Sequence, residues 1–153
     1  MKGPILLLFT IVAATMSFDI NYIHNIISIT NLTMEEFLSC INKTHIRFED
    51  IMHVDAIIED NLEIDFDDVA LKVGCLFNCI FEKKEIMTGA HINVNKIKEI
   101  MRTIIGEEEH NLKILDPHFQ ILDTCSNWVK SIINKCEVSL KFMTCGAHKS
   151  QRY

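Results

Sequence analysis

The sequence predicts an all-α domain of about six short helices, cross-braced by disulfide bonds. Apolar residues recur at spacings of three and four along most of the 153-residue chain, and no segment alternates as a strand would. Six cysteines follow an N-terminal leader, and an even number of cysteines in a secreted chain is typical of a disulfide framework. We therefore expect helices held together by three disulfides.

The N-terminus has the parts of a secretory signal peptide. A basic residue near the start is followed by the apolar run Ile5–Ala14 and by small and polar residues up to Ser17. This run is too short to cross a bilayer, which needs about twenty apolar residues. The alternative interpretation is a buried helix. We expect residues 1–17 to be the signal peptide and residues 18–153 to be one secreted, extracellular domain.

The charge balance excludes two classes of partner. Because Lys2 leaves with the signal peptide, 14 of the 15 basic residues remain against 21 acids, a net charge of −7. A negative domain is not expected to bind nucleic acid or to insert into an anionic membrane. Nine acids lie in residues 49–68, but the stretch lacks the glycine and closing glutamate of an EF-hand, so we interpret it as a solvated face.

The first elements are predicted from apolar spacing and from one cap. Phe18–Ile29 has an amphipathic helical pattern, and residues 48–58 predict another short helix. Between them, Thr33 and Glu36 have the spacing of a capping box, so a helix through residues 37–41 should follow. This part of the chain also holds two N-glycosylation sequons, which make Asn31 and Asn42 candidate glycosylation sites.

The central helix is predicted from near Asp65, which can cap it, to Lys84. Cys75 and Cys79 lie four residues apart on it. Its apolar residues recur at helical spacing, namely Phe66, Val69, Val73, Leu76, Phe77 and Ile80. The other cysteines lie on either side of it in the chain, so this helix is expected to be the element to which other segments are tied.

Three further helices are predicted after a turn at Thr88–Ala90. Asn93 caps the first, and Gly106 ends it. A polar loop over residues 107–110 follows, and Asp116-Pro117 starts the next helix because proline is favoured at the first helical position.

Trp128, Val129, Ile132 and Ile133 are expected to extend that helix, and the last helix is predicted from Cys136 to about Thr144. Only eight residues follow Cys145, a tail long enough to lie over a pocket mouth. His148 in this tail is the candidate for a pH-dependent switch, because histidine titrates near neutral pH.

Helix geometry limits the disulfide pairing. Cys136 and Cys145 would lie about 13 Å apart along a helix, beyond the roughly 7 Å allowed between bridged Cα atoms. Helical side-chain directions also make a bond between Cys75 and Cys79 awkward. About ten connectivities remain, and each ties the central helix to two different cysteines elsewhere. Zinc is the competing interpretation, but the last three cysteines are too widely spaced for it.

The full cysteine pattern resembles that of the insect odorant-binding proteins, of the pheromone- and general-odorant-binding family. It reads Cys40-x₃₄-Cys75-x₃-Cys79-x₄₅-Cys125-x₁₀-Cys136-x₈-Cys145. The x₃ and x₈ spacings, Glu137 after the fifth cysteine and the leader carry the resemblance, which covers essentially the whole mature chain. The long first gap is similar to that of hymenopteran pheromone-binding members. The chain departs from the pattern in its longer gap after Cys79, its sequons and its acidic segment.

The resemblance implies the pairs Cys40–Cys79, Cys75–Cys136 and Cys125–Cys145, with the helices arranged around an apolar cavity. It implies a carrier that reversibly binds a small hydrophobic ligand such as an odorant, a pheromone or a lipid-like molecule. A membrane chemoreceptor or a second copy of the chain would be the protein partner. Our candidate lining is Met52, Ile57, Leu76, Phe77, Ile80, Met101, Ile104, Ile121, Leu140 and Phe142.

The chain offers no catalytic set. Its seven histidines are scattered, and none lies in a motif with a serine or free cysteine nucleophile. We expect no enzymatic activity, no cofactor and no metal. The alternative function is a secreted, disulfide-bonded helical signalling or structural protein with a filled core.

Overall fold

The computed structural model describes residues 31–47, 49–50 and 68–150. These residues form five α-helices and one two-stranded hairpin: α3 (Met34–Thr44), α6 (Asp68–Lys83), β1 (Met87–Thr88), β2 (His91–Ile92), α7 (Val94–Ile105), α8 (Glu109–Val129) and α9 (Lys135–Ser150). The all-α fold class is thereby confirmed. The leader, the helix predicted over 18–29, nearly all of that over 48–58, and the cap Asp65 lie outside the described residues.

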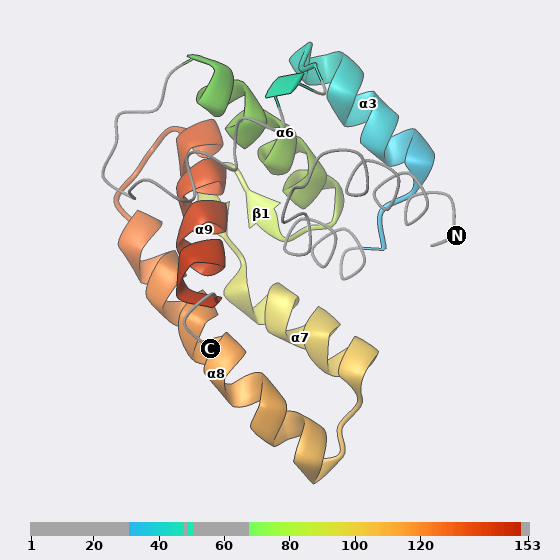
Figure 1. Ribbon diagram of the computed structural model, residues 1–153, viewed down its shortest axis with the longest axis vertical. Helices are drawn as coiled ribbons and strands as arrows, with labels where there is room; N and C mark the ends of the chain where they lie inside the picture. The colour runs from blue at the N-terminus through green and yellow to red at the C-terminus, as the bar shows by residue number, and fades with distance from the viewer. Residues whose placement is uncertain (1–30, 48, 51–67, 151–153) are drawn as a thin grey trace.

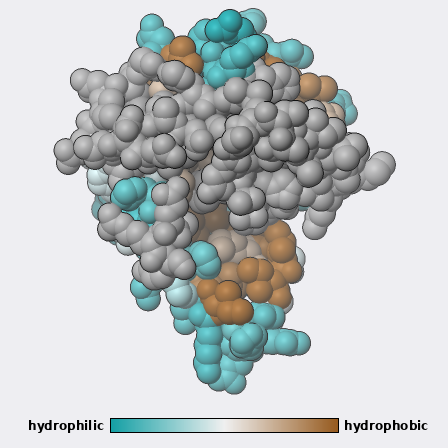
Figure 2. All heavy atoms as spheres, viewed as in Figure 1, coloured by the Kyte–Doolittle hydropathy of each residue, from teal (hydrophilic) through white to brown (hydrophobic). Residues whose placement is uncertain are grey.

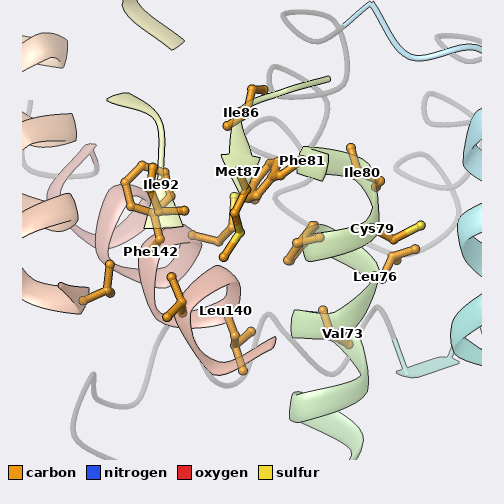
Figure 3. Packing of buried hydrophobic residues seen from close by; sticks show 14 of the residues in the cluster. Val73, Leu76, Cys79, Ile80, Phe81, Ile86, Met87, Ile92, Leu140 and Phe142 are labelled. Atoms are coloured by element: carbon orange, nitrogen blue, oxygen red, sulfur yellow. The ribbon is translucent and has the colours of Figure 1, made fainter. Parts of the chain in front are cut away.

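The helices pack in an order that differs from their order in the chain. α6 lies against both α3 and α9, α9 lies against α8, and α8 lies against α7 (Figure 1). α6 is therefore enclosed between two helices, and its buried residues point in several directions rather than along one stripe. The apolar core centres on α6, the hairpin and α9, whose buried side chains meet around Met87 (Figure 3).

A glycine allows α6 and α9 to approach closely. A Cβ atom on Gly74 would lie 2.1 Å from the carbonyl oxygen of Cys136 and 3.0 Å from Cβ of Leu140. No side chain larger than hydrogen fits at this crossing, since ordinary contacts of a Cβ atom begin near 3.4 Å. The sequence signal is a single glycine inside a helical pattern, which often marks a packing reason.

The hairpin carries a buried sulfur that joins three elements. β1 and β2 pair antiparallel, with Met87 opposite Ile92, and Gly89 turns the chain with a φ of 58°. Nδ2 of Asn78 lies 3.2 Å from the Met87 sulfur and can donate to it. Oγ of Ser139 lies 3.1 Å from the same sulfur, but its single proton is shared with the Lys135 carbonyl oxygen, 2.8 Å away. The predicted turn at Thr88–Ala90 is confirmed. The strands were not predicted, because two residues are too few to show an alternating pattern.

Three of the four predicted caps are confirmed, and the fourth, Asp65, lies outside the described residues. Thr33 and Glu36 form the reciprocal capping box, with hydrogen bonds of 3.0 and 3.1 Å. Asn93 Oδ1 accepts a bond of 3.2 Å from the Lys96 amide at the start of α7. Gly106 ends that helix, and its amide donates to the Arg102 carbonyl at 2.8 Å.

The predicted start of α8 is wrong. The helix begins at Glu109, and Pro117 lies inside it rather than at its first position. Proline leaves the carbonyl four residues earlier without its helical partner. That carbonyl belongs to Lys113, which lies on the exposed side of α8, where water can supply the missing donor. Burial of Leu115 at 0% exposure favours the longer helix.

The predicted boundary between the last two helices is also wrong. α8 includes Trp128 and Val129 as predicted but ends there, so Ile132 and Ile133 belong to the connection that follows it. Oδ1 of Asn134 accepts hydrogen bonds from the amides of Cys136 and Glu137, 3.0 and 3.1 Å long. This side chain starts a new helix at Lys135. α9 then continues to Ser150, so His148 lies on this helix and the residues just after Cys145 are not a loose tail.

Candidate functional site

Three disulfides link the helices in the same order as their packing. Cys40–Cys79 joins α3 to α6, Cys75–Cys136 joins α6 to α9, and Cys125–Cys145 joins α8 to α9. The corresponding Cα separations are 5.7, 4.3 and 5.7 Å. These are the pairs that the resemblance implies, and the expected bracing by three disulfides is confirmed. Among the five helices described, only α7 carries no cysteine.

α7 is held to α8 by charged side chains along one edge. The Lys98 ammonium lies 2.8 and 2.9 Å from the two carboxylate oxygens of Asp123. The same ammonium lies 5.6 Å, and the Arg102 guanidinium 5.0 Å, from the ring centre of Phe119. Such exposed ion pairs contribute about 0.2–1 kcal/mol each, so α7 is bound less firmly than the disulfide-linked helices.

The apolar side of α7 is only partly covered. Ile97 is buried and Met101 is half-buried, but Ile104 is 48% and Ile105 40% exposed. Figure 2 shows hydrophobic surface gathered over α7, with hydrophilic surface at the tip where α7 and α8 meet. Among the described residues, this helix therefore presents apolar surface that α8 and the other elements leave partly uncovered.

Eight of the ten predicted lining residues lie in the described part of the chain. Six of them are buried: Leu76, Phe77, Ile80, Ile121, Leu140 and Phe142. Met101 is half-buried and Ile104 is exposed, while Met52 and Ile57 lie outside the described residues.

These residues do not all face one space. In Figure 3, Leu76 and Ile80 leave α6 on the side of Cys79, which is bonded to α3, whereas Phe81 points toward Met87. Leu140 and Phe142 are two apart on α9, so their side chains point to nearly opposite sides of that helix. A ligand cavity between α7 and α9 could therefore be lined by Leu140 or by Phe142, and not by both.

A cleft of about 600 Å³ lies at a place that the sequence did not predict. It is bounded by the hairpin, the end of α8 and the connection to α9, and none of the ten predicted residues lines it. Its residues are Thr88, Ala90, His91, Ile92, Ser126, Asn127, Val129, Lys130, Ile132 and Ile133. The one local signal is the apolar pair Ile132–Ile133 in a polar stretch.

Charge pairing also fixes the N-terminal end of α3. Nζ of Lys84 lies 2.8 Å from the carboxylate of Glu36 and 3.3 Å from the carbonyl of Asn31. The hydrogen bond from Lys84, followed by that from the Thr33 amide, holds the pKa of Glu36 below its usual value of 4.5. Near this helix, the Arg47 amide lowers the pKa of Asp50 in the same way.

Within residues 31–47, 49–50 and 68–150, no group of three histidine, cysteine or acidic side chains is arranged to hold a metal ion. All six cysteines are in disulfides. None of the helices described is both long and apolar enough to cross a membrane.

The fold and the bracing define a class of protein, which is a small all-α domain whose helices are linked by three disulfides. The family model that matches the sequence, over residues 30–149, is that of the PBP/GOBP family. The chain belongs to this family, whose members are binding carriers rather than enzymes.

Similar curated proteins include several from the genus Solenopsis. The chain is similar to "Pheromone-binding protein Gp-9" of Solenopsis globularia littoralis, with 29% identity over 112 residues that cover 72% of this chain and 69% of the relative. The proteins of the same name from Solenopsis geminata and Solenopsis richteri are 26% and 23% identical over the same length, covering 72% of this chain and 70% of each relative. No solved structure matches the sequence.

Proposed function

We propose that this protein is a secreted carrier that reversibly binds a small hydrophobic ligand against the apolar side of α7. The ligand class is that of odorants, pheromones and lipid-like molecules, since the relatives bear the name of pheromone-binding proteins. Its protein partner would be a membrane chemoreceptor or, in a homodimer, a second copy of the chain.

The observation that carries the proposal is the unfilled apolar side of α7 within a frame that cannot collapse onto it. Disulfides fix α6, α8 and α9 relative to one another, whereas α7 carries no cysteine and is held by the Lys98–Asp123 pair and by the packing of Ile97 and its apolar neighbours against the core. Met101 lies three residues after Lys98, beside the charged edge, and is half-buried between buried Ile97 and exposed Ile104 along the chain. An alkyl chain placed there would gain about 0.8 kcal/mol for each methylene removed from water.

The weakly held helix also supports reversible binding. A ligand that enters between α7 and its neighbours needs a wall that can move without unfolding the domain. The Lys98–Asp123 pair can break and reform at a cost of about 1 kcal/mol or less. The disulfide-linked helices α6, α8 and α9 would keep the opposite walls in place meanwhile.

The test is displacement of a fluorescent apolar probe from the oxidised protein by alcohols, esters and acids of increasing chain length. We expect probe binding, and displacement that strengthens with each added methylene. Met101→Glu should weaken probe binding at least tenfold, because a carboxylate would have to be buried with the ligand. Thr103→Glu is the matched control, because it places the same charge on the exposed side of α7.

The opposite results would separate the two function classes. Absence of probe binding by folded, oxidised protein would favour the secreted signalling or structural protein with a filled core. Equal binding by the Met101→Glu and Thr103→Glu variants would show that ligand binds elsewhere than on α7.

A further inference from the structure

We propose that the cleft between the hairpin and the α8–α9 connection is a second binding site, which takes an anionic amphiphile with a carboxylate head group and a short alkyl chain. This site is separate from the apolar side of α7. None of its residues belongs to α7 or to the candidate lining predicted from the sequence.

The cleft has the size and the mixed lining of a ligand site. Its volume of about 600 Å³ lies within the range of roughly 300–1,000 Å³ usual for small-molecule pockets. Val129 and Ile92 are buried at its floor, and Ile132 is half-buried beside them. Ile133 is 92% exposed, although isoleucine is among the residues most often buried. A bound alkyl chain would cover this side chain.

The charge of the lining selects an anion. The chain as a whole carries a net charge of −6, yet the cleft residues include no aspartate or glutamate. Lys130 is the single fully charged residue among them, and it lies next to buried Val129. Asn127, Ser126 and Thr88 add polar groups that can donate to carboxylate oxygens. A carboxylate head group placed at Lys130 would pair with the polar part of the lining, and the alkyl chain of the ligand would lie against Ile92, Ile132 and Ile133.

The walls are held in place before any ligand arrives. On one side, the hairpin is fixed by its antiparallel pairing and by a bond of 2.7 Å from the Asn93 amide to the Ile86 carbonyl. On the other side, the Cys125–Cys145 bridge holds the end of α8, and the Cys75–Cys136 bridge holds the start of α9. Little ordering is then required on binding, which favours affinity.

The experiment is a titration of ¹⁵N-labelled, oxidised protein with octanoate and, separately, with octanol, followed by amide chemical shifts. Octanoate should shift the amides of residues 88–92 and 126–133 saturably at up to millimolar concentration. Octanol has the same chain without the charge and should bind there more weakly, by about threefold, which is the expected worth of an exposed ion pair.

Two variants with matched controls test the parts of the site. Lys130→Gln should weaken octanoate binding about threefold and leave octanol unchanged, whereas Lys113→Gln at the other end of α8 should change neither. Ile133→Gln should weaken both ligands severalfold because apolar area is lost, and Leu38→Gln on α3 should not. Each replaced side chain is exposed, so the variants should fold.

The outcomes distinguish this inference from the proposed function. Unmoved cleft amides, or equal octanoate affinity in the wild type and Lys130→Gln, would overturn the second site. Shifts confined to α7 would overturn it while supporting the proposed function. Shifts at the cleft in a protein that binds no apolar probe on α7 would support the second site alone.

Discussion

The contact between α6 and α9 at Gly74 yields the most demanding prediction. Replacing Gly74 by alanine would put a methyl group 2.1 Å from the Cys136 carbonyl oxygen. The two helix backbones must therefore separate by about 1 Å or more to restore an ordinary contact. They cannot do so freely, because the Cys75–Cys136 bridge holds them together at the adjacent residue.

The magnitude follows from two opposing effects. Overpacking costs about 1–3 kcal/mol, and the upper end applies here because the obstacle is backbone rather than a movable side chain. The higher helix propensity of alanine stabilises the folded state by about 1 kcal/mol relative to glycine and offsets part of this cost. The net loss in the free energy of unfolding should be about 2 kcal/mol, or roughly a thirtyfold fall in the ratio of folded to unfolded protein.

The assay is denaturant unfolding of the oxidised wild type and Gly74→Ala, extrapolated to water. Lys72→Ala, an exposed site on the same helix, is the control and should change stability by less than about 0.5 kcal/mol. With Cys75 and Cys136 both replaced by serine, the cost of Gly74→Ala should shrink, because α9 can then shift. A Gly74→Ala protein as stable as the wild type, or more stable, would refute the close approach of the two backbones.

Three further predictions concern the caps, the core and the surface. Glu36→Gln should destabilise the fold by about 1 kcal/mol at pH 7. The hydrogen bond from Lys84 lowers the pKa of Glu36 in the folded protein, so the Glu36 carboxylate contributes its full stability at pH values above its usual pKa of 4.5. This stability is lost as the pH falls through the lower pKa of the folded state. The wild type and Glu36→Gln should therefore become equally stable in acid unfolding experiments. Met87→Leu keeps the side-chain volume but removes the sulfur that accepts from the side-chain amide of Asn78, a residue only 3% exposed. The substitution should lower the free energy of unfolding by about 1–2 kcal/mol in denaturant. An unchanged unfolding midpoint would contradict this prediction. Asn31 and Asn42 are both exposed, so the protein secreted from eukaryotic cells should have a mass above that of its polypeptide. Replacing either asparagine by glutamine should remove the mass of one glycan. A secreted wild type with the mass of the bare polypeptide would disprove glycosylation at both sites.

Helix caps, which depend on hydrogen bonds between residues close together in the chain, could be predicted from the sequence. Thr33 and Asn93 bond to amides three residues ahead, and Gly106 bonds back to the preceding turn. These bonds close within one helical turn, so they depend little on the rest of the molecule. The number of cysteines and their spacing likewise predicted the bracing, and only the resemblance chose one pairing among those that geometry left open.

The failures share one cause, because each depends on what another segment does. Pro117 was read as a helix start, yet α8 runs through it because Leu115 upstream finds a buried position. Ile132 and Ile133 continue an apolar pattern but lie outside α8, since Asn134 starts a new helix that the Cys75–Cys136 bridge holds against α6.

The helical class, three caps and the number of disulfides could be predicted from the sequence alone, because periodicity and local hydrogen bonding operate over a few residues. Which apolar residues share a space depends on the tertiary structure. The packing of the helices left one side of α7 partly uncovered and brought residues 88–92 beside 126–133 to form a cleft. These contacts between distant segments depend on how closely whole helices pack. At Gly74, α6 and α9 can approach closely because glycine has no side chain.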